Sequence, residues 1–263
     1  MKDKEFVEET LDFSKKLNLD LLKESHVFEQ VSSTNKKAKE LAKKNVPDGT
    51  IIISKTQDNG RGRFNRVWIS PEGGVYFSII LKPKNKDEKL TLLPLVAALS
   101  VYNTIYSLCD LDVKIKWPND VIINGKKISG ILIESESKNN SLDFVVIGIG
   151  FNLNVDVDIF PEEYNATSLS YEIGINLDYY DFLKKLLFTL DKYYSLFINE
   201  DYDTILNEWR KNSDTIGKNV VINLKDKKIS GRAVDIDENG FLIILDEYGN
   251  KTKITSGDCF YIK

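Results

Sequence analysis

Arginine is rare in this chain and is concentrated in one short segment. The 263 residues contain 36 Lys and Arg, yet Arg occurs only at positions 61, 63, 66, 210 and 232. Three of these five lie in GRGRFNR, where Gly60 and Gly62 allow the backbone to approach a ligand closely. Because a guanidinium is a rigid fork of donors that suits phosphate and carboxylate, we interpret this segment as an anion-binding loop.

A second basic group lies on a predicted strand. Lys114 and Lys116 alternate with apolar residues in VKIKW, and Pro118 ends the strand. A lysine on a rigid strand beside arginines on a flexible loop can stabilise the charge that develops in phosphoryl or adenylyl transfer. Taken alone, the loop favours a functional site over a solvated basic turn, whereas a lysine pair on a strand is usually only a polar face.

Other catalytic signatures are missing from the sequence. The single histidine, His26, excludes an H-E-x-x-H zinc site, and no G-x-x-x-x-G-K-[ST] phosphate loop occurs. Gly148 and Gly150 begin a dinucleotide-binding pattern, but Leu153 breaks it, so we interpret these glycines as points of close approach. No carboxylate cluster predicts a metal site built by the protein, and magnesium is expected only through a nucleotide.

Composition excludes several classes of protein. The 40 Asp and Glu against 36 Lys and Arg leave a net charge of -4, which gives no general attraction to nucleic acid. Cys109 and Cys259 cannot form a disulfide framework and are expected to be reduced thiols. The charged N-terminus and the interrupted apolar stretch 92–108 predict neither a signal peptide nor a membrane span. A cytoplasmic protein is expected.

The hydrophobic pattern predicts the elements that position these residues. Asn124-Gly125 between two apolar runs predicts a hairpin, and 155–177 are expected to be irregular. After Ser213, short strands and turns replace helices, which predicts a catalytic domain over 1–212 and a small β-barrel over 213–263. Helices are predicted over 3–17, from 32–34 to 44, and over 87–108, 181–197 and 203–211, with strands over 26–31, 50–55, 74–81, 113–117 and 144–154.

In combination, the motifs resemble the biotin protein ligase family. KWPND following GRGR is the most specific part of the match. The resemblance covers roughly residues 28–263 and implies an α+β fold, in which a mixed β-sheet of the class II synthetase-like, biotin/lipoate ligase type has helices packed on one side and precedes an SH3-like barrel. The matching motifs are Ser33-Thr34-Asn35, GRGR at 60–63 with Trp68 beyond it, KWPND at 116–120, KISGIL at 127–132, IGIGFN at 147–152 and ATSL at 166–169.

The resemblance also implies a reaction and a partner. Members of this family activate biotin with ATP and magnesium to biotinyl-5'-AMP and release pyrophosphate. They then transfer biotin to one lysine of a biotin carboxyl carrier domain, such as that of acetyl-CoA carboxylase. We therefore expect a carrier domain as partner, and neither DNA nor a membrane. A homodimer is expected from the family alone.

Carried over by position, the resemblance implies roles for individual residues. Lys116 and Arg63 are expected to be catalytic, because they can neutralise the carboxylate and the α-phosphate as these two anions join. The Gly-Arg loop and residues 155–170 are expected to cover the reactive adenylate and exclude water. Biotin is expected to contact Ser33, Thr34, Asn35, Gln57, Arg61, Gly62, Arg63, Lys116 and Gly130, and the adenylate Arg63, Trp68, Lys116, Asn119, Asn152, Ala166 and Ser168.

The sequence departs from the family in two places. Some members read GRGRRG, whereas Phe64 and Asn65 stand at the last two positions here, a difference that bears on how tightly the adenylate is held. Members that also act as repressors carry an N-terminal helix-turn-helix domain, and the residues before His26 are too few for one. A monofunctional enzyme is therefore expected.

Two alternative functions stay open. A lipoate or octanoate ligase-type acyltransferase shares the expected fold, but its G-G-G-x-V-x-H-D stretch is missing from this sequence. A biotin-sensing regulator without catalysis would need a basic recognition helix. The lysines between Lys36 and Lys44 are typical of the solvent face of an ordinary helix instead.

Overall fold

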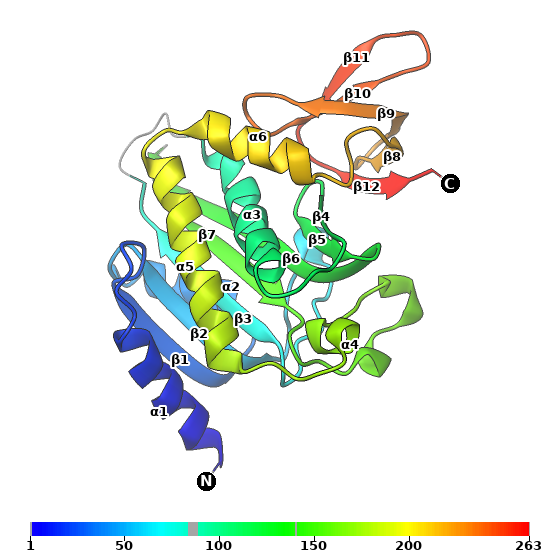
Figure 1. Ribbon diagram of the computed structural model, residues 1–263. Coiled ribbons are helices and arrows are strands. Elements are labelled where there is room, and N and C mark those ends of the chain that lie inside the picture. The colour runs from blue at the N-terminus through cyan, green and yellow to red at the C-terminus, as the bar shows by residue number, and fades with distance from the viewer. Residues whose placement is uncertain (1, 84–88, 140, 263) are drawn as a thin grey trace.

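Two β-sheets form the framework of the molecule. The computed structural model describes residues 2–83, 89–139 and 141–262 (Figure 1). In the described chain, seven strands form a sheet of order β1-β2-β3-β7-β6-β5-β4, and five strands near the C-terminus form a second sheet. The strands of the first sheet are β1 (Glu24–Val31), β2 (Thr50–Gln57), β3 (Val75–Leu81), β4 (Val113–Lys116), β5 (Asp120–Ile123), β6 (Lys126–Lys138) and β7 (Ser141–Phe151).

The first sheet is mixed, which confirms the predicted fold class. Strand β1 pairs with β2 in parallel, and every other neighbouring pair is antiparallel. Asn124 and Gly125 connect β5 to β6 with φ values of 50° and 76°. These positive angles are those of a tight hairpin turn, so the hairpin predicted from Asn-Gly is confirmed.

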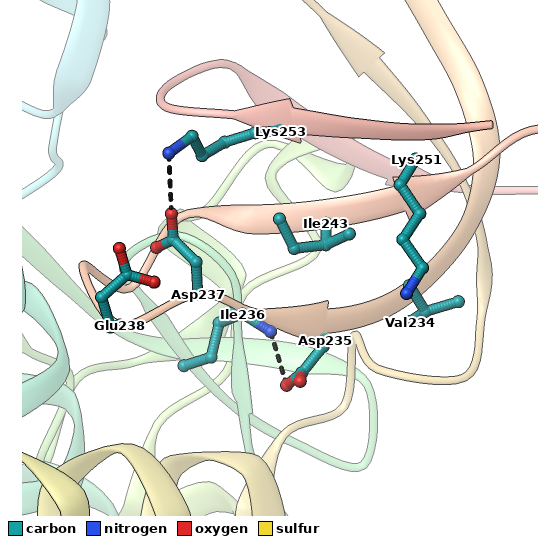
Figure 2. Close-up of a pocket in the computed structure, with 8 residues that line it drawn as sticks. All are labelled: Val234, Asp235, Ile236, Asp237, Glu238, Ile243, Lys251 and Lys253. Carbon is teal, nitrogen blue, oxygen red and sulfur yellow. Dashed lines mark hydrogen bonds and ion pairs between the residues drawn. The ribbon is translucent and has the colours of Figure 1, made fainter.

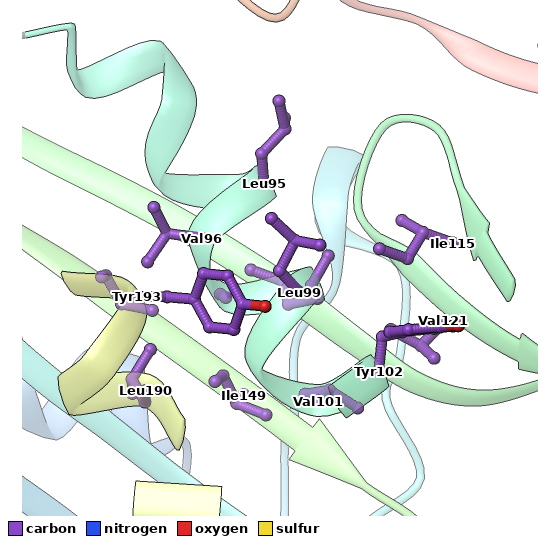
Figure 3. Close-up of a cluster of buried hydrophobic side chains, with 14 of the residues drawn as sticks. Leu95, Val96, Leu99, Val101, Tyr102, Ile115, Val121, Ile149, Leu190 and Tyr193 are labelled. Carbon is purple, nitrogen blue, oxygen red and sulfur yellow. The ribbon is translucent and has the colours of Figure 1, made fainter. Parts of the chain in front are cut away.

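A large hydrophobic core lies between this sheet and two long helices, α3 (Leu93–Tyr106) and α5 (Tyr179–Ile198). Figure 3 shows side chains of both helices, among them Leu99 and Tyr193, gathered with Ile149 of β7. Burial of one such aliphatic side chain contributes about 1.5–3 kcal/mol. The core therefore holds the strands that carry the basic residues in a fixed arrangement.

One helix lies on the opposite face of the sheet. Helix α2 (Thr34–Ala42) buries Ala38 and Ala42 in a separate cluster with Ile52, Ile80, Phe144 and Val146. Successive strand residues point to opposite faces, so Ile52 faces α2 while its neighbours in β2 face the large core. The expectation of helices on one side only is therefore wrong.

Most predicted helix positions are confirmed, with shifted ends. Helices α1 (Lys2–Lys15) and α6 (Tyr202–Asn212) match their predictions. The helix predicted from 87 begins instead with a 3-10 turn at Leu90–Leu92 that leads into α3, whose first turn contains Pro94; residues 87 and 88 lie outside the described chain. Between 155 and 177, the short helix α4 (Leu169–Ile173) follows the 3-10 turns Val157–Ile159 and Glu162–Tyr164.

The C-terminal sheet is antiparallel and open. Its strands are β8 (Asn219–Asn223), β9 (Lys228–Ile236), β10 (Leu242–Leu245), β11 (Lys251–Ile254) and β12 (Asp258–Tyr261), in the order β11-β10-β9-β8-β12. Among the described residues, no pairing joins the edge strands β11 and β12, so the predicted SH3-like β-barrel is an open sheet and not a closed barrel.

Two further properties concern the chain as a whole. Cys109 and Cys259 are both free, as predicted. None of the helices in the described residues combines the length and apolarity needed to cross a bilayer.

Candidate active site

A large cavity brings together segments that are far apart in the sequence. Its volume is 1180 Å³, and it is lined by strands β6 and β7, the start of α2, the Gly-Arg loop (residues 60–66) and the C-terminal sheet. Every predicted site residue except Ser168 lines it, namely Ser33, Thr34, Asn35, Gln57, Arg61, Gly62, Arg63, Trp68, Lys116, Asn119, Gly130, Asn152 and Ala166.

Uncharged polar groups line one part of this cavity. The Thr34 N–H donates to Gln57 Oε1 at 2.8 Å, and Thr34 Oγ1 donates to the same oxygen at 3.2 Å. Ser78 Oγ lies 2.8 Å from Thr34 Oγ1 and 2.7 Å from Asn35 Oδ1. Ser33, Thr34 and Asn35 are buried at the first turn of α2, so these groups are rigid. Fixed donors and acceptors of this kind suit a small neutral polar ring.

The glycines of IGIG give two side chains room to approach β7. A Cβ at Gly148 would lie 1.9 Å from Asn35 Oδ1, and one at Gly150 would lie 2.4 Å from Trp68 Nε1. The interpretation of these glycines as points of close approach is confirmed. Asn35 is held there because its amide also donates to Glu134 Oε2 at 2.9 Å.

The Gly-Arg loop folds back on itself as a short turn. Gly62 N–H donates to Arg66 O at 2.8 Å, and both Phe64 and Asn65 have positive φ, at 55° and 59°. Asn tolerates this left-handed conformation better than most residues, and Asn65 stands where some family members carry Gly. The departure in sequence therefore keeps a compatible backbone. Its effect on adenylate retention stays a prediction.

Both arginines beyond Gly62 contact the C-terminal sheet. Arg63 Nη1 donates to Gly257 O at 3.1 Å and to Asn119 Oδ1 at 3.4 Å, and Arg66 forms an ion pair with Asp258. Burial lowers the pKa of Arg63, although the Asp258 and Asp120 carboxylates oppose this effect. The guanidinium stays charged at neutral pH because its ordinary pKa is so high.

Lys116 occupies the last position of β4, opposite Asp120 of β5. Its Nζ lies 4.6 Å from the centroid of the Tyr261 ring. None of the ion pairs found in the described residues includes Lys116. An ammonium without a carboxylate partner is available to attract an anionic ligand.

Trp68 and Asn152 form another part of the cavity. Lys127 Nζ lies 5.2 Å from the centre of the Trp68 ring and 2.7 Å from Asp120 Oδ1. Asn152 is 1% exposed and donates to Thr167 O at 2.9 Å, while its Oδ1 has no hydrogen-bond partner. A buried acceptor left unpaired is costly, so a ligand amino group would be stabilised here. This arrangement suits a purine base over an indole ring.

Ser168 caps a helix and is not among the residues that line the cavity. Its Oγ accepts a hydrogen bond from Tyr171 N–H at 3.4 Å at the start of α4, and its contact with the adenylate stays a prediction. Ala166 does line the cavity, because the adjacent segment pairs with β6 through Thr167 N–H and Lys127 O at 2.9 Å. Closure of 155–170 over a ligand stays a prediction.

Sequence reasoning missed the contribution of the C-terminal sheet. Asp214, Lys218, Asp258, Cys259 and Tyr261 all line the cavity, and no motif marks them. Burial raises the pKa of Cys259 to about 11, so this thiol is neutral and unreactive at neutral pH. Lys127 was also missed, although it lies within KISGIL.

A second cavity of 640 Å³ lies on the C-terminal sheet alone. Figure 2 shows Lys253 directed at Asp237, and these two groups are 3.2 Å apart. Asp235 is paired with Arg210 at 2.7 Å. None of the predicted site residues lines this cavity, so it is not the candidate active site.

The segments that line the large cavity match known protein families. Residues 27–152 match the Biotin/lipoate A/B protein ligase family, and residues 215–261 match the Biotin protein ligase C terminal domain. The Bifunctional ligase/repressor BirA of Bacillus spizizenii is 38% identical over 231 residues, which are 87% of this chain and 71% of that protein.

The chain belongs to the biotin protein ligase family. A biotin--[acetyl-CoA-carboxylase] ligase of Paracoccus denitrificans is 29% identical over 88% of this chain and 98% of that protein. The biotin protein ligase from Aquifex aeolicus in complex with biotin and ATP has a TM-score of 0.78 and 33% identity, covering 92% of this chain and all of that one. The first match spans biotin and lipoate enzymes together, whereas the C-terminal match is specific to biotin protein ligases. Family membership thus argues against the lipoate alternative.

Proposed function

We propose that this protein is an ATP-dependent biotin protein ligase that activates biotin as biotinyl-5'-AMP and transfers it to a lysine of a biotin carboxyl carrier domain. One observation carries this proposal. A single cavity holds a rigid uncharged polar network around Thr34, the guanidinium of Arg63 and the unpaired ammonium of Lys116. These three features suit, in order, a neutral ring, an anionic phosphate and a carboxylate.

In the first step, a biotin carboxylate oxygen attacks the α-phosphorus of ATP. The bond from that phosphorus to the bridging oxygen breaks, and pyrophosphate leaves. Two anions meet in this transition state, so Lys116 between the carboxylate and the α-phosphate, with Arg63 on the phosphate, lowers the barrier electrostatically. The Thr34 network and Gln57 orient the neutral ring, and Trp68 with Asn152 receives adenine.

In the second step, the amine of the carrier lysine attacks the acyl carbon of the adenylate. The carbon–oxygen bond to phosphate breaks, AMP leaves, and the lysine nitrogen loses a proton. The mixed anhydride must be kept from water until the carrier arrives. We infer that the Gly-Arg loop provides this protection, because Arg63 and Arg66 already hold it against the C-terminal sheet.

Magnesium and the location of the reaction are finer parts of the proposal. The described residues contain no group of three or more His, Cys, Asp or Glu side chains placed to hold a metal. We infer that magnesium arrives bound to the phosphates of ATP. Two free cysteines suit a reducing compartment, so we infer the cytoplasm. The homodimer and the lack of DNA binding remain predictions.

Transfer to a carrier tests the complete proposal. The protein is incubated with ATP, magnesium, biotin and a purified biotin carboxyl carrier domain, and the carrier mass is followed by mass spectrometry. The expected result is the addition of one biotinyl group, which disappears when the acceptor lysine of the carrier is replaced by arginine. Adenylate formation without any transfer would contradict the ligase, and binding of biotin without adenylate formation would favour a biotin-sensing regulator.

A further inference from the structure

We propose that Tyr261, on the last strand of the C-terminal sheet, is a positioning residue for Lys116: its ring holds the ammonium in the cavity without neutralising it. The inference rests on the proposed function, in which Lys116 contacts the reacting groups. The C-terminal sheet would thus influence the chemistry through Lys116.

The contact differs from those of the neighbouring lysines. Lys116 Nζ lies 4.6 Å from the Tyr261 ring centroid, within the range of a cation–π interaction. Lys114 instead lies 3.7 Å from a carboxylate oxygen of Asp112, and Lys127 lies 2.7 Å from one of Asp120. A carboxylate would compete with the anionic substrates for the ammonium, whereas a ring attracts it and leaves its charge available.

The Tyr261 ring is itself fixed in place. Its backbone pairs with Val220 of β8, and its hydroxyl lies 3.3 Å from Thr215 Oγ1. Thr215 is fully buried and accepts a hydrogen bond from Trp117 N–H at 2.9 Å. The residue after Lys116 is thus tied to the same threonine as the ring. This arrangement fixes both the backbone next to Lys116 and the Tyr261 ring against which its ammonium lies.

A second lysine shares the ring. Lys218 Nζ lies 4.3 Å from the same centroid, but it is also 2.7 Å from Asp214 Oδ1. Its charge is therefore largely compensated, which limits its repulsion of Lys116. Among the described groups around the ring, Lys116 is the cation that stays without a carboxylate partner. Any test must separate the effect of Tyr261 on Lys116 from its effect on Lys218.

The kinetic test compares substitutions of Tyr261 in single-turnover formation of biotinyl-adenylate. Tyr261→Leu is expected to lower the rate constant about tenfold, the scale of one lost cation–π contact at a partly buried site. Tyr261→Phe keeps the ring and is expected to stay within about twofold of the unsubstituted protein. Tyr248→Leu, the same change at an 81% exposed position beyond β10, is the matched control and should have no effect.

A double-substitution cycle shows which lysine mediates the effect. In a Lys116→Met background, adding Tyr261→Leu should change the remaining rate less than twofold, because its target is gone. In a Lys218→Met background, the full loss of about tenfold should persist. A tenfold loss that persists without Lys116, or equal losses for Tyr261→Phe and Tyr261→Leu, would overturn the proposal.

A measurement independent of activity separates this inference from the proposed function. In NMR spectra of the full chain, the ε-methylene of Lys116, assigned through Lys116→Met, should be shifted upfield by the ring. The shift should persist in Tyr261→Phe and disappear in Tyr261→Leu. If Tyr261→Leu unfolds, Tyr261→Met replaces it, and the shift should disappear there too. An unshifted methylene in the unsubstituted protein would refute the contact, whatever reaction the protein performs.

Discussion

At the scale of residues, the cations near the cavity have different partners. Arg63 and Arg66 contact groups near β12, whereas the Lys116 ammonium lies over the Tyr261 ring and takes part in none of the ion pairs of the described residues. The arginines hold the loop against the C-terminal sheet. In the proposed mechanism, Arg63 and Lys116 also act on the reacting anions.

Replacement of Lys116 tests its catalytic role. Lys116→Ala is expected to keep the fold and to raise the barrier to adenylate formation by about 3 kcal/mol, the scale of one lost charged donor in an active site. The rate is measured as biotin-dependent pyrophosphate release. Lys114→Ala on the same strand is the matched control, because Lys114 is outside the cavity lining. A near-normal rate for Lys116→Ala would remove this residue from the mechanism.

Replacement of Arg63 tests the protective role of the loop. In Arg63→Ala, the contacts to Gly257 and Asn119 disappear, so the Gly-Arg loop should order less well and bound biotinyl-adenylate should escape at least several-fold faster. A chase with unlabelled biotin measures this rate, and Arg232→Ala on β9 provides a control. An unchanged dissociation rate would mean that Arg63 has no part in retaining the adenylate.

At the scale of elements, local sequence signals predicted individual strands and turns but did not predict how distant elements pack together. The Asn124-Gly125 hairpin and the core strands followed from turn chemistry and periodicity, which depend on near neighbours. The position of α2 on the second face depends on distant strand residues such as Phe144, which no local pattern reveals. The five-residue helix α4 is too short to produce a periodic signal. The helix-capping role of Ser168 could not be predicted for the same reason, because it requires that helix.

The turn between β9 and β10 offers a prediction about stability. Asp237 Oδ1 accepts hydrogen bonds from Asn239 and Phe241 N–H, both at 2.9 Å. Burial tends to raise the pKa of Asp237, but these N–H groups and Lys253 outweigh it and lower the pKa. A lowered pKa means that the ionised carboxylate stabilises the fold above its unfolded pKa of about 4, and that this stabilisation disappears as the pH falls further.

Accordingly, Asp237→Ala should lower the free energy of unfolding by about 1–3 kcal/mol at pH 7. Chemical denaturation at pH 7 and at pH 3 measures the difference, which should shrink at the lower pH. Asp226→Ala, at an exposed turn of the same sheet, should have little effect at either pH. If Asp237→Ala lowered the free energy of unfolding equally at pH 7 and pH 3, the stabilisation would not come from the ionised carboxylate.

At the scale of the whole molecule, the two sheets share one hydrophobic core. Buried residues of the C-terminal sheet, such as Ile236 and Leu242, belong to the same cluster as those of α3. Trp117 Nε1 also donates to Gly240 O at 3.3 Å, across the junction. The predicted boundary at 212/213 follows a change of pattern along the chain. The sequence does not reveal that the C-terminal sheet supplies Tyr261 and Lys218 to the cavity, because no motif marks either residue.

A shared core predicts cooperative unfolding. Separation of the two sheets would expose apolar surface around Gly240, where a Cβ would lie 3.2 Å from side-chain atoms of Leu92 and Leu95. We therefore expect a single transition, with coincident curves from tryptophan fluorescence and far-ultraviolet circular dichroism. Two separate transitions would show instead that residues 1–212 and 213–263 are stable independently.

The central claim is that this cavity activates biotin with ATP. The most direct measurement is pyrophosphate release by the purified protein with ATP and magnesium, with biotin and lipoate supplied in parallel, followed by mass spectrometry of the bound product. We expect a burst with biotin only and a retained biotinyl-5'-AMP. A burst with lipoate, or no release with either acid, would contradict this claim.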